Sequence, residues 1–202
     1  MMLDKYGANQ DPYCYPGTSI LKNRLNLTSD DLLSDAERAL SEVALSLIEF
    51  APPPYDLSYL KYLHRLLFAD LYDWAGELRT VDISKGNTRF CTTTRIEPEA
   101  KKIFAPLANV NWLQELEREQ LVNASAEAFG DLNVIHPFRE GNGRAQRVLF
   151  EHLIMNAGYE ISWWAVEAEE WMQANIYAVD CEYGPLINVF ERCIGKPILP
   201  ET

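Results

Sequence analysis

The sequence predicts an all-α protein, a helical bundle that carries one small β-hairpin, and two observations support this class. Apolar residues recur at spacings of three and four over most of the chain, as in helices that bury one face. β-branched and aromatic residues flank a Gly-Asn turn in only one segment, residues 80–97. The chain has 202 residues, of which 48% are hydrophobic, so it can bury a sizeable core. We therefore expect a single domain over residues 1–202.

The amino-terminal residues 1–27 are rich in turn-forming residues and lack a helical repeat, so we expect an irregular extension there. The core of the domain is expected at about residues 30–195. A first helix follows Thr28, which has an N-cap arrangement with Asp31, and it stops before the prolines at 52–54. Its predicted apolar face consists of Leu33, Ala36, Leu40, Val43 and Leu47.

A second helix is predicted from Asp56 or Ser58 to about Trp74, and it ends near Gly76. Its apolar stripe consists of Leu60, Leu63, Leu67 and Leu71. His64 stands beside this stripe. We expect it to be a packing or surface residue, because no second His or Cys lies at a metal-binding spacing from it.

The segment 80–97 has the pattern of a β-hairpin, with residues 84–87 as its turn. An isolated two-stranded hairpin is only marginally stable in water, so this one is expected to lie against helices. Its strand edges would then be free to pair with another chain.

The rest of the chain is predicted to be helical. The expected helices cover residues 98–108, 113–135, 145–157, 167–179 and 185–194. The third of these stops at Gly158, and its buried face consists of Ala145, Val148, Leu149, His152 and Leu153. In the last helix, Pro185 suits the first turn and Gly195 a carboxy-terminal cap.

The composition excludes some classes of function. The formal net charge is −12, which argues against non-specific binding to nucleic acid or to an anionic membrane. No apolar run reaches the ~18 residues of a membrane-spanning helix, and no signal peptide opens the chain. The four cysteines are scattered without a CxxC pair. We expect a soluble, cytoplasmic protein with reduced thiols.

The most informative segment, residues 136–147, reads His-Pro-Phe-Arg-Glu-Gly-Asn-Gly-Arg-Ala-Gln-Arg. Pro137 ends the preceding helix, and the turn at 141–143 opens the next one. The first N–H groups of a helix have no partner within the helix and bind anions such as phosphate. Arg144 and Arg147 are three positions apart, so both can project from one side of this helix towards phosphate oxygens.

Two further side chains of this segment suggest chemistry. A carboxylate at Glu140 would repel a phosphate unless a cation such as Mg²⁺ lay between them, so Glu140 is a candidate metal ligand. His136 has an ordinary pKa near ~6.5 and could accept a proton from an attacking hydroxyl. Phe138 lies two positions after His136 and two before Glu140. We expect its side chain to point into the core and anchor the loop.

Each of these residues has a plainer explanation when it is taken alone. A histidine before a proline is usually structural, a glycine turn often only opens a helix, and an arginine pair is often solvated. The whole segment could also be a capping loop that binds no ligand.

The segment resembles the signature of the Fic family, His-x-Phe-x-(Asp/Glu)-Gly-Asn-Gly-Arg-x-x-Arg, at every fixed position. Residues 11–17 are similar to the start of bacterial Fic toxins, and residues 73–79 with the 80–97 hairpin resemble the family's helix and flap. The resemblance implies the Fic fold, which is helical apart from that flap. It also implies transfer of AMP from ATP, with Mg²⁺, to a hydroxyl of a target protein, usually on tyrosine.

The resemblance also implies roles for individual residues. His136 would be the general base and Glu140 the Mg²⁺ ligand. The residues implied to hold the nucleotide phosphates are Gly141, Asn142, Gly143, Arg144 and Arg147, with the Asn142 side chain assisting the backbone. The flap residues implied to hold the target by main-chain pairing are Ser84, Lys85, Gly86, Asn87, Thr88, Arg89 and Phe90. Trp171 and Asn175 could line the adenine pocket or belong to the core.

Many Fic proteins contain an inhibitory helix, (Ser/Thr)-x-x-x-Glu-(Gly/Asn), whose glutamate pairs with the second arginine. Residues 93–97 have this spacing, but Pro98 follows and the match is incomplete. The chain therefore resembles toxins whose inhibitory helix is supplied by a separate small antitoxin. In such toxins the targets include the ATPase subunits of DNA gyrase and topoisomerase IV.

Two alternatives remain open at this stage. Relatives that phosphorylate their targets carry a lysine where this chain has Gly143, so a phosphate-transferring enzyme of the same fold is the first. The second is a non-catalytic module that binds a nucleotide and docks a partner through its hairpin.

Overall fold

The computed structural model describes residues 11–114 and 116–198. In this part of the chain it contains seven α-helices and two small antiparallel sheets, which confirms the predicted all-α class. The helices are α1 (Asp30–Ser46), α2 (Leu57–Phe68), α3 (Ile96–Asn109), α4 (Arg118–Ile135), α5 (Asn142–Asn156), α6 (Ala168–Val179) and α7 (Gly184–Cys193). The strands are β1 (Ser84–Lys85), β2 (Thr88–Arg89), β3 (Tyr159–Ile161) and β4 (Ile194–Pro197), and short 3₁₀ turns lie at Thr93–Arg95 (η1) and Trp163–Ala165 (η2).

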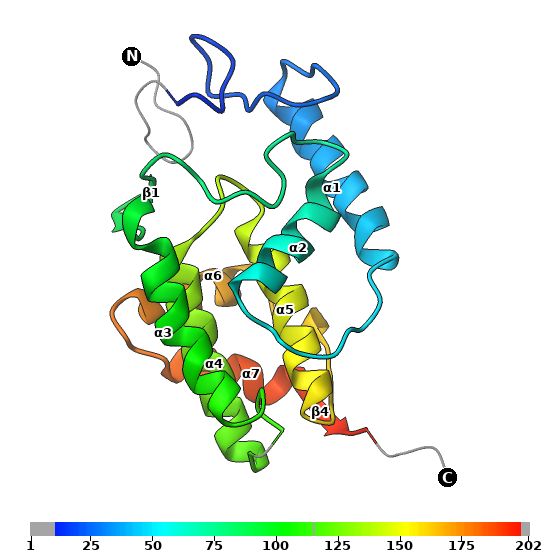
Figure 1. The fold of residues 1–202 in the computed structure, drawn as a ribbon, viewed down its shortest axis with the longest axis vertical. Helices are drawn as coiled ribbons and strands as arrows, with labels where there is room; N and C mark the ends of the chain where they lie inside the picture. Colours follow the sequence, from blue (N-terminus) through cyan, green and yellow to red (C-terminus); the bar gives the residue numbers. More distant parts are fainter. Residues whose placement is uncertain (1–10, 115, 199–202) are drawn as a thin grey trace.

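Helices α4 and α5 lie at the centre of the fold (Figure 1). The pair α1–α2 packs on α5 through α2, whereas α3, α6 and α7 pack on α4. The predicted buried face of α5 is confirmed, because the five side chains expected on it are at most 4% exposed. None of the helices described has the length and apolarity needed to cross a membrane.

Helix α1 buries a different face from the predicted one. Val43 is 61% exposed and Leu47 is 75% exposed, so the expected stripe is wrong in the second half of the helix. The inward face instead includes Glu37 and Ser41, whose side chains contact Arg144 of α5. The helix also begins after Ser29, without a side-chain cap. The apolar stripe is thus shifted rather than absent: Leu33, Leu40 and Ala44 pack on the core, with the polar contacts of Glu37 and Ser41 beside them.

Two helix ends differ from the sequence prediction. Helix α2 starts as expected, with the Asp56 side chain accepting a hydrogen bond from the Tyr59 N–H, but it ends at Phe68. The following residues form turns that lead to Gly76, whose φ of +81° glycine adopts readily. Helix α4 starts at Arg118 rather than at 113, because residues 111–113 have left-handed backbone angles.

The predicted hairpin is present as β1–β2, with Ser84 opposite Arg89 and Lys85 opposite Thr88, but it is shorter than predicted. Ser84 and Lys85 belong to a strand and not to the turn, and residues 93–97 belong to η1 and α3. The sheet β3–β4 was not predicted. Its strands are short and lie on either side of α6 and α7, so neither produces an alternating pattern. Gly195 belongs to β4 and not to a helix cap. A Cβ at this position would lie 3.2 Å from the Cβ of Glu160, so a residue without a side chain allows the two strands to approach.

The amino-terminal segment is more integrated than its composition suggests. Cys14 and Leu21 form an isolated β-bridge, and both are buried in the main hydrophobic core. This core thus begins before residue 30, and residues 11–27 pack on the bundle although they form no helix.

Candidate active site

The signature segment forms the loop between the end of α4 and the start of α5. His136 terminates α4 in a left-handed conformation with a φ of +49°, and its N–H still donates to the Leu132 carbonyl, 3.2 Å away. Pro137 then ends the helix, as predicted. Gly141 precedes the first turn of α5 with a φ of +78°. The candidate base and the first N–H groups of α5 are therefore separated only by this short loop.

The two glycines of the turn have different roles. A Cβ on Gly141 would lie 2.4 Å from Cε2 of Phe68, so the backbone can pass over this ring only without a side chain. A Cβ on Gly143 would meet no heavy atom of the described neighbouring residues within 4 Å, so this position faces open space. Packing against Phe68 thus requires glycine at position 141. At position 143, glycine leaves space beside the first turn of α5.

Asn142 fastens the loop onto itself. Its side-chain oxygen accepts a hydrogen bond from the Phe138 N–H, and its amide donates to the Phe138 carbonyl, both at 2.8 Å. The side chain is 4% exposed. The resemblance implied that this side chain assists phosphate binding. In the structure, both the oxygen and the amide of this side chain bind the backbone of Phe138. The backbone N–H of Asn142 is therefore the group better suited to a phosphate.

His64 supports the same loop from α2. Its Nδ1 accepts a hydrogen bond from the Gly76 N–H at 2.8 Å, so in the neutral ring the hydrogen is on Nε2, which donates to the Glu140 carbonyl at 2.9 Å. The ring stacks on Phe138 with its centroid 3.9 Å away. Burial lowers the pKa of His64 to about 4, which keeps this tautomer neutral. The prediction of a packing residue is confirmed, but no sequence pattern indicated its contact with the loop.

His136 is arranged as a neutral base. Its Nδ1 lies 3.1 Å from the Asn133 carbonyl and must donate to it, which leaves the lone pair of the neutral ring on Nε2. The ring stacks on Phe90 of the hairpin, with centroids 3.9 Å apart. Burial lowers the pKa of His136 to about 4; the Asn133 carbonyl and Glu140 oppose this shift, and Arg79 adds to it. The imidazole is therefore uncharged at neutral pH and able to accept a proton.

The two predicted phosphate-binding arginines differ in their contacts. Arg144 forms an ion pair with Glu37, donates to the Ser41 hydroxyl at 2.8 Å and lies over the Phe68 ring at 4.8 Å. Arg147 is half-buried and makes no hydrogen bond or ion pair with any residue that the structure describes. Burial, and then the neighbouring Arg144, lower the pKa of the Arg147 guanidinium. The carboxylate of Glu151 opposes this shift, although it forms no ion pair with Arg147 in the described part of the chain.

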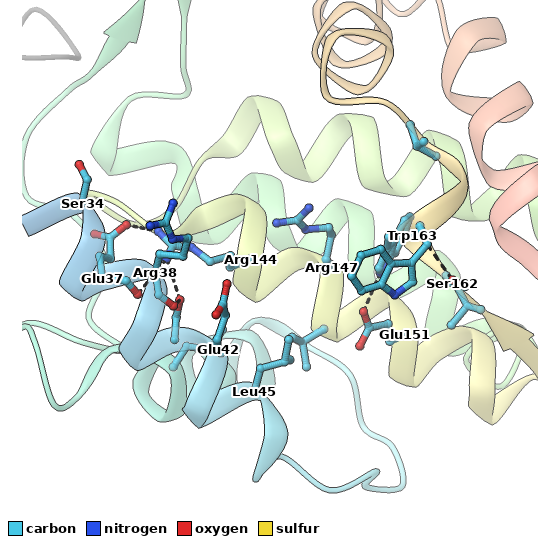
Figure 2. A pocket seen from close by; sticks show the side chains of 16 residues that line it. Ser34, Glu37, Arg38, Glu42, Leu45, Arg144, Arg147, Glu151, Ser162 and Trp163 are labelled. Carbon is cyan, nitrogen blue, oxygen red and sulfur yellow. Dashed lines mark hydrogen bonds and ion pairs between the residues drawn. The ribbon is translucent and has the colours of Figure 1, made fainter. Parts of the chain in front are cut away.

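Both arginines line a cavity of about 830 Å³ between α1, α5 and η2 (Figure 2). Its walls also carry the carboxylates Glu37, Glu42 and Glu151, and Glu151 accepts a hydrogen bond of 2.6 Å from the Trp163 indole N–H. Gly141 to Gly143 do not line this cavity. The cavity therefore shares the two arginines with the predicted phosphate site but not the backbone of the glycine turn.

The position of Glu140 is compatible with a carboxylate that binds a metal ion together with a phosphate. Its Oε1 accepts a hydrogen bond from the Gly141 N–H at 3.1 Å, which places the carboxylate at the entrance of α5. Nowhere in residues 11–114 and 116–198 do three His, Cys, Asp or Glu side chains gather as a metal site. An Mg²⁺ ion bound here would take one protein carboxylate, with phosphate oxygens and water completing its shell.

Of the seven predicted docking residues of the hairpin, six are exposed or partly exposed and one is buried. Ser84 to Arg89 are exposed or partly exposed, as a docking edge requires. Phe90 is 7% exposed and packs with Ile83 beneath the hairpin, against His136. Its side chain packs on the ring of His136, the candidate base, and is not available to a target.

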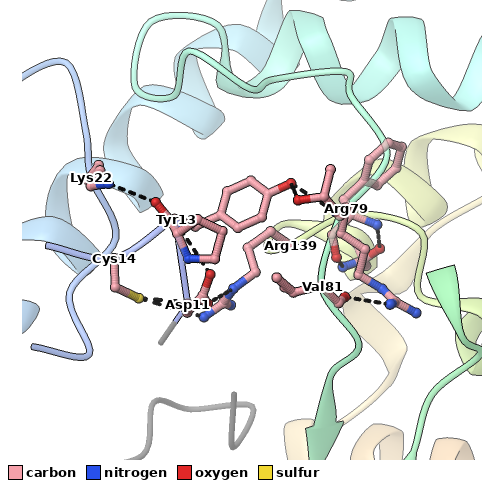
Figure 3. Close-up of polar contacts among 11 residues, drawn as sticks. Asp11, Tyr13, Cys14, Lys22, Arg79, Val81 and Arg139 are labelled. Carbon is pink, nitrogen blue, oxygen red and sulfur yellow. Dashed lines mark hydrogen bonds and ion pairs between the residues drawn. The ribbon is translucent and has the colours of Figure 1, made fainter. Parts of the chain in front are cut away.

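The amino-terminal segment closes the loop from the other side, a role that the sequence did not reveal (Figure 3). Asp11 forms a 2.5 Å ion pair with Arg139, the variable residue in the middle of the signature, and both side chains are 2% exposed. The Tyr13 hydroxyl accepts a hydrogen bond from the Thr80 N–H at 3.1 Å, at the base of the hairpin.

The two candidates for the adenine pocket lie in α6. Trp171 packs edge-on against Phe129 at 5.0 Å and against Trp163 at 5.4 Å, which favours a core role. The Asn175 amide donates to the Trp171 carbonyl at 2.8 Å, and its oxygen is buried without a hydrogen-bond partner among the described residues. A contact between Asn175 and adenine stays a prediction.

Comparisons with known proteins agree with this site. A model of the Fic/DOC family matches residues 54–154, half of the chain. The chain is 42% identical over 195 residues to the "Probable protein adenylyltransferase Fic" of Escherichia coli (strain K12), covering 96% of this chain and 98% of the relative. It is 37% identical to the protein adenylyltransferase VbhT of Bartonella schoenbuchensis, covering 85% of this chain and 36% of VbhT.

A solved structure is similar over nearly the whole length. The BepC protein of Bartonella tribocorum, a VirB-translocated effector crystallised with bound AMPPNP, superposes with a TM-score of 0.84 at 26% identity. The match covers 92% of this chain and 96% of BepC. With the family model and the E. coli relative, it supports one conclusion: this chain belongs to the Fic/DOC family.

Proposed function

We propose that this protein transfers AMP from ATP to a hydroxyl group, on tyrosine, of a target protein. The observation that carries the proposal is the neutral His136, held one short loop away from the open N-terminus of α5. Relatives that are named protein adenylyltransferases, and a similar structure with bound AMPPNP, support the choice of reaction.

In the proposed reaction, the N–H groups of Asn142 and Gly143 and the guanidinium of Arg147 bind the phosphates of ATP, while the Gly141 N–H donates to Glu140. Glu140 would hold Mg²⁺, which neutralises phosphate charge when it is bound. The target hydroxyl gives its proton to Nε2 of His136 while its oxygen forms a bond to the α-phosphorus. The bond from this phosphorus to the oxygen that bridges to the β-phosphate breaks, and pyrophosphate leaves.

The hairpin would position the target. Its edge at Ser84 to Arg89 offers backbone groups to an extended segment of another protein, in the way that strands are added to a free sheet edge. Because such pairing reads the backbone more than side chains, we expect loose selection around the modified residue.

The test uses ATP labelled either at the α-phosphate or at the γ-phosphate, incubated with the protein, Mg²⁺ and a bacterial lysate. We expect protein-bound label only from the α position, and a mass increase on the target tyrosine that corresponds to AMP. Label from the γ position alone would instead indicate a phosphate-transferring enzyme, and binding of ATP without protein labelling would indicate a non-catalytic module. This chain has glycine at position 143, where phosphorylating relatives carry lysine, and this residue favours AMP transfer.

A separate small antitoxin is the proposed restraint on this activity, which would act in the cytoplasm, with the ATPase subunits of gyrase and topoisomerase IV as candidate targets. Two observations support an external inhibitor. Glu97, in the incomplete inhibitory match, lies on α3, and no ion pair joins it to Arg147 in the described part of the chain. Arg147 itself lines the 830 Å³ cavity beside the 44%-exposed Leu45 of α1.

Purification of the protein together with the products of its neighbouring genes tests this partner. We expect a small protein to remain bound, and Leu45→Asp to release it, because the charge would face the apolar part of the cavity wall. Leu25→Asp is the matched control, since Leu25 is 49% exposed and does not line the cavity. Isolation of the protein alone, with full transfer activity, would contradict the antitoxin proposal.

A further inference from the structure

Arg79 is a buried arginine that joins the hairpin to the candidate base. It precedes β1, and its side chain is buried at the junction between the hairpin and the end of α4 (Figure 3). Its guanidinium donates to four backbone carbonyls: Nε to His136 at 2.8 Å, Nη1 to Val81 at 2.8 Å, and Nη2 to Ile135 at 3.2 Å and to Cys91. Its own backbone N–H donates to the Pro137 carbonyl at 2.9 Å.

These acceptors belong to two separate parts of the site. Ile135 is the last residue of α4 and His136 is its cap, where the carbonyls at the end of a helix favour a cation. Val81 and Cys91 flank the hairpin, one before β1 and the other after β2. The planar guanidinium of Arg79, here called the fork, therefore connects the residues on both sides of the hairpin to the carbonyl of His136, the candidate base.

The only carboxylate near Arg79 among the described ion pairs is Asp82, whose Oδ1 lies 3.8 Å from Nη1 and whose side chain is 48% exposed. Burial accordingly lowers the pKa of Arg79, although an arginine stays charged in proteins. Burying this charge is unfavourable unless its donors are satisfied, and here carbonyls satisfy them. A lysine has a single ammonium and cannot span the same four acceptors.

Further contacts connect the same two parts. The Cys91 N–H donates to the Val134 carbonyl of α4 at 3.0 Å. Phe90, one residue earlier, stacks on the ring of His136. Movement of the hairpin relative to α4 would therefore displace the imidazole.

We propose that Arg79 is a positioning residue that sets the hairpin and His136 in one fixed geometry, so that a target segment paired with the hairpin presents its hydroxyl to Nε2. This inference rests on the proposed function. The phosphate site has its own supports, His64 and the Asn142 side chain, which Arg79 does not touch. Loss of the fork should therefore affect the target and spare ATP.

The test compares Arg79→Lys with Arg118→Lys. Arg118 also donates to backbone carbonyls, those of Ile194 and Glu191 at 2.8 and 3.1 Å, but from the first residue of α4, about 26 Å from the last by the helical rise. Transfer is measured with ATP and target varied separately, together with the affinity for ATP and the thermal melting temperature.

For Arg79→Lys we expect kcat/KM for the target to fall by about 10- to 100-fold, since misplacement by about 1 Å has this effect on oriented reactions. The dissociation constant for ATP should stay within about two-fold of wild type, and Arg118→Lys should change neither value. Transfer by Arg79→Lys at the wild-type rate would overturn the inference. So would a loss of ATP affinity as large as the loss of transfer, because that result indicates a general structural role.

Two further measurements keep the test independent of folding and of the proposed function. If Arg79→Lys does not fold, Phe90→Leu should produce the same loss for the target without loss for ATP; an unchanged Phe90→Leu enzyme would then overturn the inference. If wild type itself labels no protein, the proposed function fails, and amide hydrogen exchange still tests the coupling. The Cys91 amide should exchange about ten-fold faster in Arg79→Lys than in Arg118→Lys. Equal rates would refute the coupling between the hairpin and α4.

Discussion

Replacing His136 by asparagine is expected to lower kcat for AMP transfer by about 10²- to 10⁴-fold, the usual contribution of a general base. Asparagine accepts the left-handed backbone that His136 adopts, with a φ of +49°, more readily than most residues, so the loop should keep its shape. The variant lacks a group that can take the proton of the target hydroxyl. ATP should still bind with nearly wild-type affinity, because the phosphate site lies on α5.

The chain contains three histidines, of which His152 provides the comparison. His152 is buried, and its Nδ1 makes a 2.7 Å hydrogen bond with the Tyr59 hydroxyl, within the helical core. His152→Gln should therefore leave kcat unchanged, apart from any effect of stability. Steady-state transfer and calorimetric ATP binding are measured for both variants at neutral pH. If His136→Asn transferred AMP as fast as wild type, His136 would not be the base.

The sequence was sufficient for features that depend on one segment at a time. The buried face of α5 follows from a repeat within 15 residues, and the hairpin follows from its turn and flanking residues. The end of α4 at His136 and the opening of α5 follow from Pro137 and the glycines. In each case the residues that determine the structure are neighbours along the chain.

Features that depend on pairs of distant residues were missed. Glu37 turns the inward face of α1 towards Arg144, 107 positions later, and so displaces the apolar stripe that periodicity predicted. Arg79 and His136 are 57 positions apart, and nothing in either local sequence indicates the contact. The strands β3 and β4 are too short to show alternation and become strands only by pairing. A single sequence does not reveal which distant polar groups meet.

The same limitation applied to the amino-terminal segment, where a second large effect is expected. Asp11→Ala should lower the free energy of unfolding by about 3–5 kcal/mol, because it leaves the guanidinium of Arg139 buried without its carboxylate. This is a large fraction of the roughly 5–15 kcal/mol that stabilises a typical domain. Urea unfolding at neutral pH, followed by tryptophan fluorescence, measures the change.

The exposed pair Arg24–Asp73 is the matched control. Its side chains are 54% and 90% exposed and 3.7 Å apart, so Asp73→Ala should change stability by at most about 1 kcal/mol. A double variant, Asp11→Leu with Arg139→Met, removes both charges and keeps apolar volume, and it should recover most of the loss. Recovery would show that the cost arises from burying the guanidinium of Arg139 without the Asp11 carboxylate, and not from the removal of Asp11 alone.

The position of this pair relates stability to function. Arg139 stands between Phe138, on which His64 stacks, and Glu140, whose carbonyl His64 holds. Removal of the Asp11 carboxylate would therefore loosen the segment that places Glu140, the proposed metal ligand, beside the entrance of α5. Asp11→Ala should weaken ATP binding more than Asp73→Ala does, even at temperatures where both variants are folded. If Asp11→Ala were as stable and as competent in ATP binding as Asp73→Ala, the amino-terminal segment would have no part in holding the signature loop.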